Sequence, residues 1–320
     1  MSVQILKSGI LTTIQDLGRS GFRRYGINPN GVMDTAAARL VNILLGNSEN
    51  EAVLEMHFPA AEILFEKGAL FALGGADFSA MLNGKPLENG RCYLAKKKSI
   101  LRFSKKISGN RAYLSIKGGF KIENRLGSAS TNLIAGFGGL DGRKLQKDDR
   151  LFFKNQRPKT EDRSYKISNS LIPFYTQFPT VRAIAGAEFE SLSDSARETF
   201  QRENFTISQN SDRMGFRLQG KSIKLQNQKE ILSSAVNFGT IQLLPDGQMI
   251  VLMADHQTSG GYPRIANVTS VDLPLLAQLG AGDKVAFHIV SIEEAENLAL
   301  EFEKNVNLLK IAVSFSNEFH

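Results

Sequence analysis

Met249-Ile-Val-Leu-Met-Ala-Asp-His-Gln-Thr-Ser-Gly-Gly-Tyr-Pro-Arg-Ile-Ala-Asn267 joins a short apolar run to a polar loop that carries two adjacent glycines. The apolar run, Met249–Met253, is typical of a buried strand. Gly260 and Gly261 permit backbone angles closed to other residues and let a ligand or another strand approach closely. Taken alone, such a loop is more often an ordinary polar turn with a satisfied core histidine than a site. Its meaning therefore depends on the rest of the chain.

Short strand-like runs separated by glycine-bearing turns occupy both halves of the chain. Asn83-Gly84 between two alternating segments predicts a two-residue hairpin. The strands predicted by the same pattern span residues 3–6, 61–65, 70–73, 79–82, 92–95, 100–103, 111–116, 150–153, 181–185, 205–208, 241–244, 249–254 and 284–288. Many short strands without regular intervening helices favour barrels or sandwiches, so the predicted fold class is mainly β with a few short helices.

Helical spacing of apolar residues predicts four helices. The first spans about 35–45, with Asp34 as its N-cap and Gly46 after its end. The others span about 194–202, 271–279 with Ser270 as cap, and 292–303 with a capping box at Ser291 and Glu294. The last residues, 306–320, are apolar enough to pack as a strand or an arm. Residues 154–166 are polar and charged around Pro158, which predicts lobes of 1–160 and 161–320.

Composition excludes several classes of protein. The 320 residues are 42% hydrophobic and 22% charged, and no apolar stretch approaches the roughly 20 residues of a membrane span. Cys92 is the single cysteine, so no internal disulfide is expected and a cytoplasmic location is the default. The four histidines are scattered without metal-ligand spacing, which predicts no metal site. The net charge of +7 comes from dispersed Lys and Arg rather than a basic stripe, which argues against nucleic-acid binding.

Four further stretches of sequence each have more than one interpretation. Residues 215–222 match the phosphate-loop pattern G-x-x-x-x-G-K-[ST], but the alternating residues around them predict a strand, so we interpret the match as chance. Gln15–Arg19 and Ser211–Arg213 each place an acid beside an arginine, either as a local ion pair or as a site for an anion. The glycine-rich stretch 136–143 could cradle an anion, although a flexible hairpin is its commoner meaning.

Together these stretches resemble one family, the allophanate hydrolase subunit 2 or biotin-dependent carboxyltransferase family. The matching motifs run in order along nearly the whole chain: Gln15-Asp-Leu-Gly-Arg19, Gly31-Val-Met-Asp34, Leu44-Leu-Gly-Asn47, Gly74-Gly-Ala-Asp77, Leu126-Gly-Ser-Ala-Ser-Thr131, Gly138-Gly-Leu-Asp-Gly-Arg143, Ser211-Asp-Arg-Met-Gly215 and Ala254–Pro263. Asn28-Pro-Asn30 and Gly280-Ala-Gly282 depart from the usual family pattern. The resemblance implies two cyclophilin-like β-barrel lobes.

The resemblance also implies function. One kind of family member joins a subunit-1-type partner and a third component in an ATP-dependent 5-oxoprolinase, with Mg and ATP acting at the level of the complex, that opens 5-oxoproline to L-glutamate. We favour this interpretation, an ATP-hydrolysing amidohydrolase whose activity requires its partners. The first alternative is a carboxyltransferase component that uses carboxybiotin from another protein to carboxylate urea or an amide. The second alternative is a non-catalytic antagonist of a kinase inhibitor.

Candidate site residues follow from residue type and position in the family motifs. Asp255, His256 and Arg213 are the predicted catalytic group, with His256 exchanging protons near neutral pH. Arg19 or Arg213 could hold a substrate carboxylate, and backbone N–H groups around Gly260 and Gly261 could steady an oxyanion. We expect alanine at His256 or Arg213 to reduce turnover without loss of folding. The predicted substrate-binding residues are Asp16, Arg19, Asp34, Asp212, Thr258, Gly260, Gly261 and Tyr262.

Overall fold

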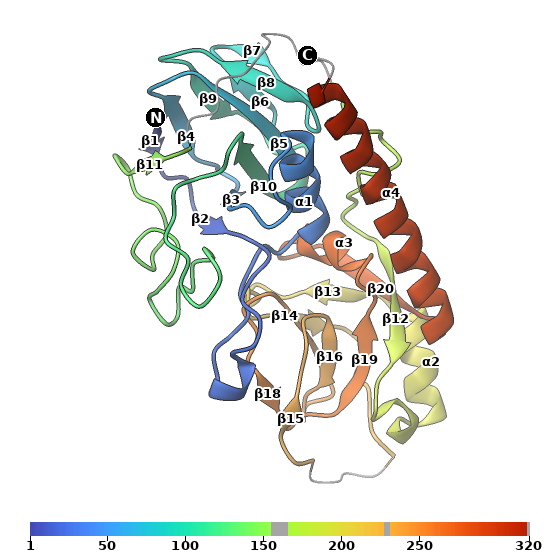
Figure 1. Ribbon diagram of the computed structural model, residues 1–320. Coiled ribbons are helices and arrows are strands. Elements are labelled where there is room, and N and C mark those ends of the chain that lie inside the picture. Colours follow the sequence, from blue (N-terminus) through green and yellow to red (C-terminus); the bar gives the residue numbers. More distant parts are fainter. Residues whose placement is uncertain (155–165, 227–230, 319–320) are drawn as a thin grey trace. The chain divides into compact units, whose positions relative to one another are not determined.

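The computed structural model describes residues 1–154, 166–226 and 231–318, and these form two units (Figure 1). The first unit comprises Met1–Arg19, Asn30–Phe174 and Glu303–His320, and the second comprises Ser20–Pro29 and Tyr175–Phe302. The predicted boundary between residues 160 and 161 lies outside the described residues. Ser20–Pro29 belongs to the second unit although both flanking segments belong to the first. We call this segment the strap.

Two antiparallel sheets build the first unit, and alternating apolar residues of both enclose one core. The first sheet has the order β11-β1-β4-β9-β6-β7 and the second the order β2-β3-β10-β5-β8. Phe65 and Ile63 from one sheet meet Phe71 and Leu114 from the other in this core. The strands are β1 (Ser2–Lys7), β2 (Thr12–Gln15), β3 (Val53–His57), β4 (Glu62–Phe65), β5 (Ala69–Asp77), β6 (Ala80–Leu82), β7 (Lys85–Pro86), β8 (Cys92–Ala95), β9 (Ile100–Phe103), β10 (Ser108–Ile116) and β11 (Arg150–Phe152).

Helix α1 (Thr35–Leu44) covers part of the second sheet. Its N-cap is Asp34, whose carboxylate accepts from the Ala37 N–H at 2.8 Å, as the sequence predicted. A Cβ placed on Gly74 of β5 would lie 2.6 Å from the Val41 side chain. Gly74 therefore lets the helix approach the sheet. The Asn83-Gly84 turn joins β6 to β7 as the predicted hairpin.

A closed barrel of seven strands forms the second unit, in the order β12-β19-β16-β17-β14-β13-β20. Parallel pairing of β12 with β20 closes it, and the other neighbours are antiparallel. Its strands are β12 (Thr180–Ala185), β13 (Phe205–Ile207), β14 (Gly215–Gln219), β16 (Thr240–Leu243), β17 (Met249–Leu252), β19 (Arg264–Val268) and β20 (Lys284–Ile289), with a separate pair β15 (Ser234–Ala235) and β18 (Ser259–Gly260). Phe200 stacks on Phe287 in its core, with ring centroids 5.0 Å apart.

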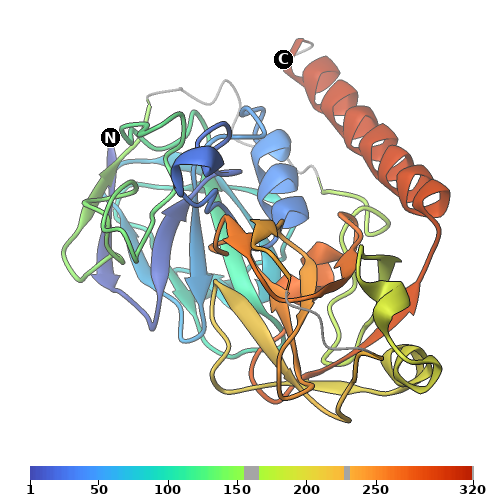
Figure 2. The same ribbon diagram turned by 90° about the horizontal axis from the view of Figure 1, so that it is seen from below.

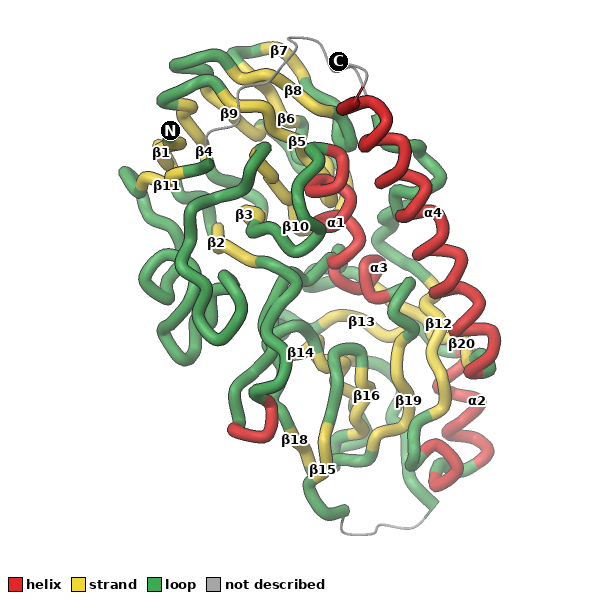
Figure 3. The backbone as a smooth tube through the Cα atoms, in the orientation of Figure 1, coloured by secondary structure: helices red, strands yellow, loops and turns green. Residues whose placement is uncertain are grey.

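The remaining helices are η1 (Arg23–Tyr25), η2 (Phe189–Ser191), α2 (Asp194–Arg202), α3 (Leu273–Ala277) and α4 (Ile292–Glu318). Figure 2 shows α4 as one unbroken helix. Figure 3 shows that the long segment between β10 and β11 is loop. No helix in the described part of the chain is long and apolar enough to cross a membrane.

The mainly β class is therefore confirmed, and three local expectations need correction. The barrel is closed in the second unit, whereas the strands of the first unit lie in two separate sheets. Helix α3 is shorter than predicted, and Asp272 rather than Ser270 precedes it. Residues 306–318 continue α4 instead of forming a strand or arm, because Val306 and Val313 bury one helical face. The capping interaction from Ser291 to the Glu294 N–H is present at 3.0 Å.

Candidate functional site

The turn that contains Asp16 anchors a long loop of the first unit. Asp16 is buried, and its two carboxylate oxygens accept four hydrogen bonds. The donors are the hydroxyls of Ser128 and Ser130 at 2.6 Å, the Ala129 N–H at 2.6 Å and the Gly18 N–H at 2.8 Å. A buried carboxylate with this many donors has its hydrogen-bonding capacity satisfied. Asp16 therefore fixes the 126–131 segment of the loop.

Arg19 is buried in the same cluster. Its guanidinium donates to the Asn30 side-chain oxygen at 2.7 Å and to the Ser130 carbonyl, and it lies 4.6 Å over the ring centre of Phe137. A Cβ on Gly138, which has φ +73°, would lie 2.1 Å from the Ser130 carbonyl oxygen and 2.7 Å from Arg19 Nη2. Asp16 and Arg19 therefore hold the glycine-rich loop in place. Both were predicted to bind substrate, and both have a structural role here.

Asp34 is also committed to the fold of the first unit. Besides capping α1, its N–H donates to the Tyr113 hydroxyl at 2.8 Å, which in turn donates to Glu55 at 2.8 Å. The Met33 N–H donates to the same Glu55 oxygen. Burial, followed by the negative charges of Glu55 and Asp34, raises the pKa of Tyr113 well above its usual value, so the phenol stays neutral.

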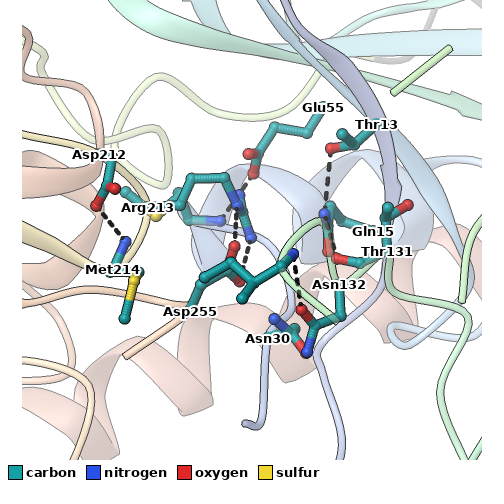
Figure 4. Close-up of polar contacts among 12 residues, drawn as sticks. Thr13, Gln15, Asn30, Glu55, Thr131, Asn132, Asp212, Arg213, Met214 and Asp255 are labelled. Atoms are coloured by element: carbon teal, nitrogen blue, oxygen red, sulfur yellow. Dashed lines mark hydrogen bonds and ion pairs between the residues drawn. The ribbon is translucent and has the colours of Figure 1, made fainter. Parts of the chain in front are cut away.

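A buried ion pair lies in the second unit, where Arg213 precedes β14 and Asp255 follows β17. Arg213 Nε and Nη2 donate to the two Asp255 oxygens at 2.9 and 3.0 Å, and each side chain is less than a tenth exposed (Figure 4). The Asp255 N–H also donates to the Arg213 carbonyl at 2.8 Å. This two-pronged geometry holds the start of the Asp255–Tyr262 loop against the turn that precedes β14.

The neighbouring Asp212 has a different task. It is exposed, and its Oδ1 accepts from the Met214 N–H at 2.8 Å (Figure 4). The same oxygen accepts from the Gly215 N–H at 3.3 Å. It closes the turn that presents Arg213. Gly215 itself begins β14, so the phosphate-loop-like motif at 215–222 lies largely on a strand and has no helix after it in the described residues up to 226. The interpretation of that motif as a chance match agrees with this geometry.

His256 is buried beside the ion pair. Its Nδ1 lies 2.5 Å from the Gln257 carbonyl oxygen. Because a carbonyl only accepts, Nδ1 carries the proton and Nε2 of the neutral ring keeps its lone pair. Burial lowers the pKa of His256 below 6.5 and Arg23 adds to this effect, while the Gln257 carbonyl and Asp255 oppose it. At neutral pH the ring is therefore uncharged and able to accept a proton.

The strap contacts this same loop. Asn28 Nδ2 donates to the carbonyl oxygens of Asp255 at 2.8 Å and His256 at 2.7 Å. Arg23 donates to the Asn237 side-chain oxygen at 2.7 Å and to the Val236 carbonyl. No sequence pattern indicated either residue, because a residue before Pro29 and an arginine in a short turn have many ordinary uses.

The paired glycines serve close approach rather than unusual backbone angles, since neither has a φ in the left-handed region. A Cβ on Gly260 would lie 2.7 Å from the Gln242 amide nitrogen, and one on Gly261 would lie 3.3 Å from the Ile231 carbonyl. Gly260 pairs with Ser234 in the β15–β18 ladder. The expected approach of another strand is therefore observed, and an oxyanion role for these N–H groups stays a prediction.

An open cavity of about 730 Å³ adjoins the end of the loop. Gly261 and Tyr262 line it, together with apolar residues of the β16–β17 turn and with Lys224 and Asp246. The Tyr262 side chain is 45% exposed, and its carbonyl accepts from Gln242. Thr258 is partly exposed on the same loop. The volume falls in the range of small-molecule pockets.

The structure thus divides the predicted site. It brings Arg213, Asp255 and His256 together in the second unit, with Thr258, Gly260, Gly261 and Tyr262 on the following residues of the same loop. Asp16, Arg19 and Asp34 lie in the first unit, each bonded to its own surroundings. Residues that the sequence analysis missed are Asn28 and Arg23 on the strap and Gln242 beneath Gly260. In the described residues, no cluster of His, Cys, Asp or Glu could hold a metal ion.

By class, this is a mainly β protein of two units, one of them a closed barrel that carries a buried arginine, aspartate and histidine beside a double-glycine loop. The chain belongs to the family described as carboxyltransferase domain, subdomain A and B, whose model matches residues 25–289.

Relatives in this family have been named. The chain is 37% identical to the 5-oxoprolinase subunit designated C of Haemophilus influenzae, over 98% of this chain and 100% of that protein. It is also 37% identical to the equivalent 5-oxoprolinase subunit of Escherichia coli, over 92% of this chain and 93% of that protein. Urea amidolyase of Saccharomyces cerevisiae is 29% identical over 93% of this chain, which spans only 17% of that protein.

Solved structures give the same fold. Urea amidolyase of K. lactis superposes with a TM-score of 0.90 at 27% identity, over 96% of this chain and 20% of that chain. The chain described as TTHA0988 superposes with a TM-score of 0.80 at 28% identity, over 90% of this chain and 55% of that chain. This chain therefore matches about a fifth of the first structure and about half of the second.

Proposed function

We propose that this protein is a subunit of an ATP-dependent 5-oxoprolinase, which opens the lactam of 5-oxoproline to L-glutamate together with partner subunits. The observation that carries this proposal is the 37% identity to a 5-oxoprolinase subunit along the whole length of both chains. The urea amidolyases match over the same residues, but this chain is only a small part of each. The two bacterial 5-oxoprolinase subunits, in contrast, are matched over 100% and 93% of their own length.

His256 is the proposed proton-transfer group. A lactam is stabilised by resonance, so its opening needs an activated carbonyl, a nucleophilic water and a base that is neutral at working pH. His256 supplies a neutral ring with its Nδ1 proton fixed by the Gln257 carbonyl, which leaves Nε2 to accept a proton. Thr258 and Tyr262 lie farther along the same loop, and Tyr262 lines the cavity, so we assign these two to substrate contact.

The Arg213–Asp255 ion pair fixes the start of the loop that carries His256. Because both Asp255 oxygens accept from Arg213, the pair positions the loop, and we assign it this task in preference to holding a substrate carboxylate. Backbone N–H groups near Gly261 remain our proposed donors to the developing oxyanion.

ATP with Mg is assigned to the complex rather than to this chain. The only sequence match to a phosphate loop, at 215–222, lies largely on β14 and lacks, in the described residues that follow it, the helix whose N-terminus would face phosphates. The residues present here therefore do not fit a nucleotide site of that kind. In our proposal, a subunit-1-type partner and a third component supply the nucleotide site. We place the complex in the cytoplasm.

The alternative function is transfer of a carboxyl group from carboxybiotin to urea or another amide. The TM-score of 0.90 to a urea amidolyase favours it. The same loop would then face the ureido ring of biotin carried by another protein, since both a ureido group and a lactam present a carbonyl beside N–H groups.

Reconstitution tests the two functions against each other. The chain is purified with its two candidate partners, and ATP-dependent glutamate release from 5-oxoproline is measured. We expect turnover by the complex and its loss, by a factor of about 100 or more, in His256→Gln. Carboxylation of urea with a biotinylated carrier, without glutamate release, would replace the proposal by its alternative. Wild-type rates in His256→Gln would remove His256 from the chemistry.

A further inference from the structure

We infer that the strap, Ser20–Pro29, is a working part of the His256 site: Asn28 positions the catalytic loop, and Arg23 ties the strap to residues 236–237 beside that loop. This inference rests on the proposed function, because it assumes that His256 is the proton acceptor. It goes further in assigning roles to two residues that lie more than 200 positions away in sequence and outside the double-glycine motif.

Asn28 holds the backbone on both sides of the histidine. One amide group donates to the carbonyl oxygens of two successive residues, Asp255 and His256, at 2.8 and 2.7 Å. Two carbonyls can converge on one donor group only if the chain turns at that point. The Asn28 amide therefore fixes the backbone turn from which the His256 side chain leaves, while the Gln257 carbonyl fixes the ring itself.

Arg23 is anchored beside the same loop, and its positive charge adds to burial, which is the main cause of the lowered His256 pKa. Its two terminal nitrogens bond the Asn237 side chain and the Val236 carbonyl, next to β15, which pairs with β18 of the same loop. An anchored guanidinium cannot swing away into solvent as a free surface arginine would. A fixed positive charge disfavours a second positive charge on the imidazole.

Two charged groups of opposite sign act on His256 within the described part of this unit. Asp255 lies beside it in the chain and favours the protonated ring, but Arg213 binds both of its carboxylate oxygens. Arg23 on the strap opposes Asp255. Neighbouring Arg24 instead lies 4.8 Å over the ring of Tyr25, which is 64% exposed. The strap therefore carries one arginine whose charge acts on His256 and one whose guanidinium lies over a tyrosine ring.

Arg23 and Arg24 provide a matched test of whether the charge of Arg23 lowers the His256 pKa. The protein is labelled at histidine Cε1, and the His256 signal, assigned with His256→Gln, is titrated by NMR in wild type and in Arg23→Gln, Arg23→Lys and Arg24→Gln. We expect Arg23→Gln to raise the His256 pKa by about 0.5 unit or more. Arg24→Gln should stay close to wild type, and Arg23→Lys, which keeps the charge without the two-nitrogen anchor, should fall between wild type and Arg23→Gln. An unchanged His256 pKa in Arg23→Gln, or an equal rise in Arg24→Gln, overturns this role for Arg23.

Asn28 is tested by the ordering of the loop and by kinetics in the reconstituted complex. In Asn28→Ala we expect faster amide hydrogen exchange at residues 254–258 and a kcat lower by about tenfold, with KM nearly unchanged. Exchange and kcat like those of wild type would overturn the positioning role. NMR and hydrogen exchange report on the strap even if no 5-oxoproline is turned over, so failure of this inference and failure of the proposed function give different results.

Discussion

Among single residues, most of the buried polar groups of the family motifs serve to hold backbone in place. Asp16 accepts four hydrogen bonds, Arg19 and Asp34 are bonded within the first unit, and Arg213 is bonded to Asp255. His256 is the member of the predicted group to which we assign chemistry, through the ring nitrogen that does not face the Gln257 carbonyl. A motif can thus be specific to a family because it folds a loop, and only one of its residues need touch the substrate.

The buried pair predicts a large stability effect for Arg213. Arg213→Met should lower the free energy of unfolding by about 3 kcal/mol, because it leaves the Asp255 carboxylate buried without its partner. Arg213→Ala is expected to destabilise for the same reason, which revises the expectation from sequence that folding would be intact. Urea denaturation measures the change, and Arg213→Met with Asp255→Leu should recover part of it. If Arg213→Met alone were as stable as wild type, the ion pair would contribute nothing to the stability of the fold.

The depressed pKa of His256 predicts a pH dependence of stability. The unfolded chain takes up a proton near pH 6.5 and the folded protein only at lower pH, so protonation favours unfolding. The contribution of His256 to the free energy of unfolding is fully present above about pH 6.5. It is lost as the pH drops through and below that value. Urea midpoints between pH 7.5 and pH 5, roughly spanning this range, should fall less steeply in His256→Gln than in wild type. Parallel curves would contradict the shift.

Among the elements, the long loop after β10 is shaped by glycines at positive φ. Gly138→Ala should destabilise strongly, by about 3 kcal/mol or more, because its Cβ would meet the Ser130 carbonyl oxygen at 2.1 Å. Gly136 has a similar φ of +67° and open space around it, so Gly136→Ala should cost only about 1 kcal/mol. Thermal unfolding of the two variants measures the difference. Equal losses of stability in the two variants would show that the positive φ alone sets the cost, and that the packing of the loop on Arg19 adds nothing.

Helix α4 depends on ion pairs within the first unit for its C-terminal half. Arg39 of α1 binds Glu303 through two nitrogens at 2.6 and 2.7 Å and Glu49 through a third at 2.6 Å. Arg39→Met should therefore increase hydrogen exchange in residues 303–315, with a cost of about 1 kcal/mol because the groups are partly exposed. Lys304→Ala, an exposed change on the same helix, is the control. Equal exchange in both variants would refute this role for Arg39.

Over the whole molecule, the described residues contain one closed barrel with a candidate site and no motif that fits a phosphate loop. We therefore expect the isolated protein to release no inorganic phosphate from ATP above background, and both ATP hydrolysis and glutamate release to arise only when partners are added. A phosphate-release assay on each component and on the mixture checks this. Hydrolysis by the isolated chain would place a nucleotide site in this subunit.

Much of the fold follows from local pattern. Strand alternation, the Asn83-Gly84 turn and the Asp34 cap involve residues within a few positions of one another, so the sequence predicts them directly. The end of α4 does not follow from its weak apolar pattern, because burial of Val306 and Val313 depends on packing against other parts of the protein. The two-sheet arrangement of the first unit likewise depends on which strands pair over long distances.

Short-range spacing and residue type encode the β class, the family motifs and the importance of the Ala254–Asn267 loop, so these could be inferred without coordinates. The task of each motif residue is instead set by long-range contacts. Hydrogen bonds between residues far apart in the chain occupy Asp16, Arg19 and Arg213 and bring Asn28 of the strap to the backbone of His256. Such contacts leave no periodic trace in sequence, since one donor and one acceptor suffice to make them.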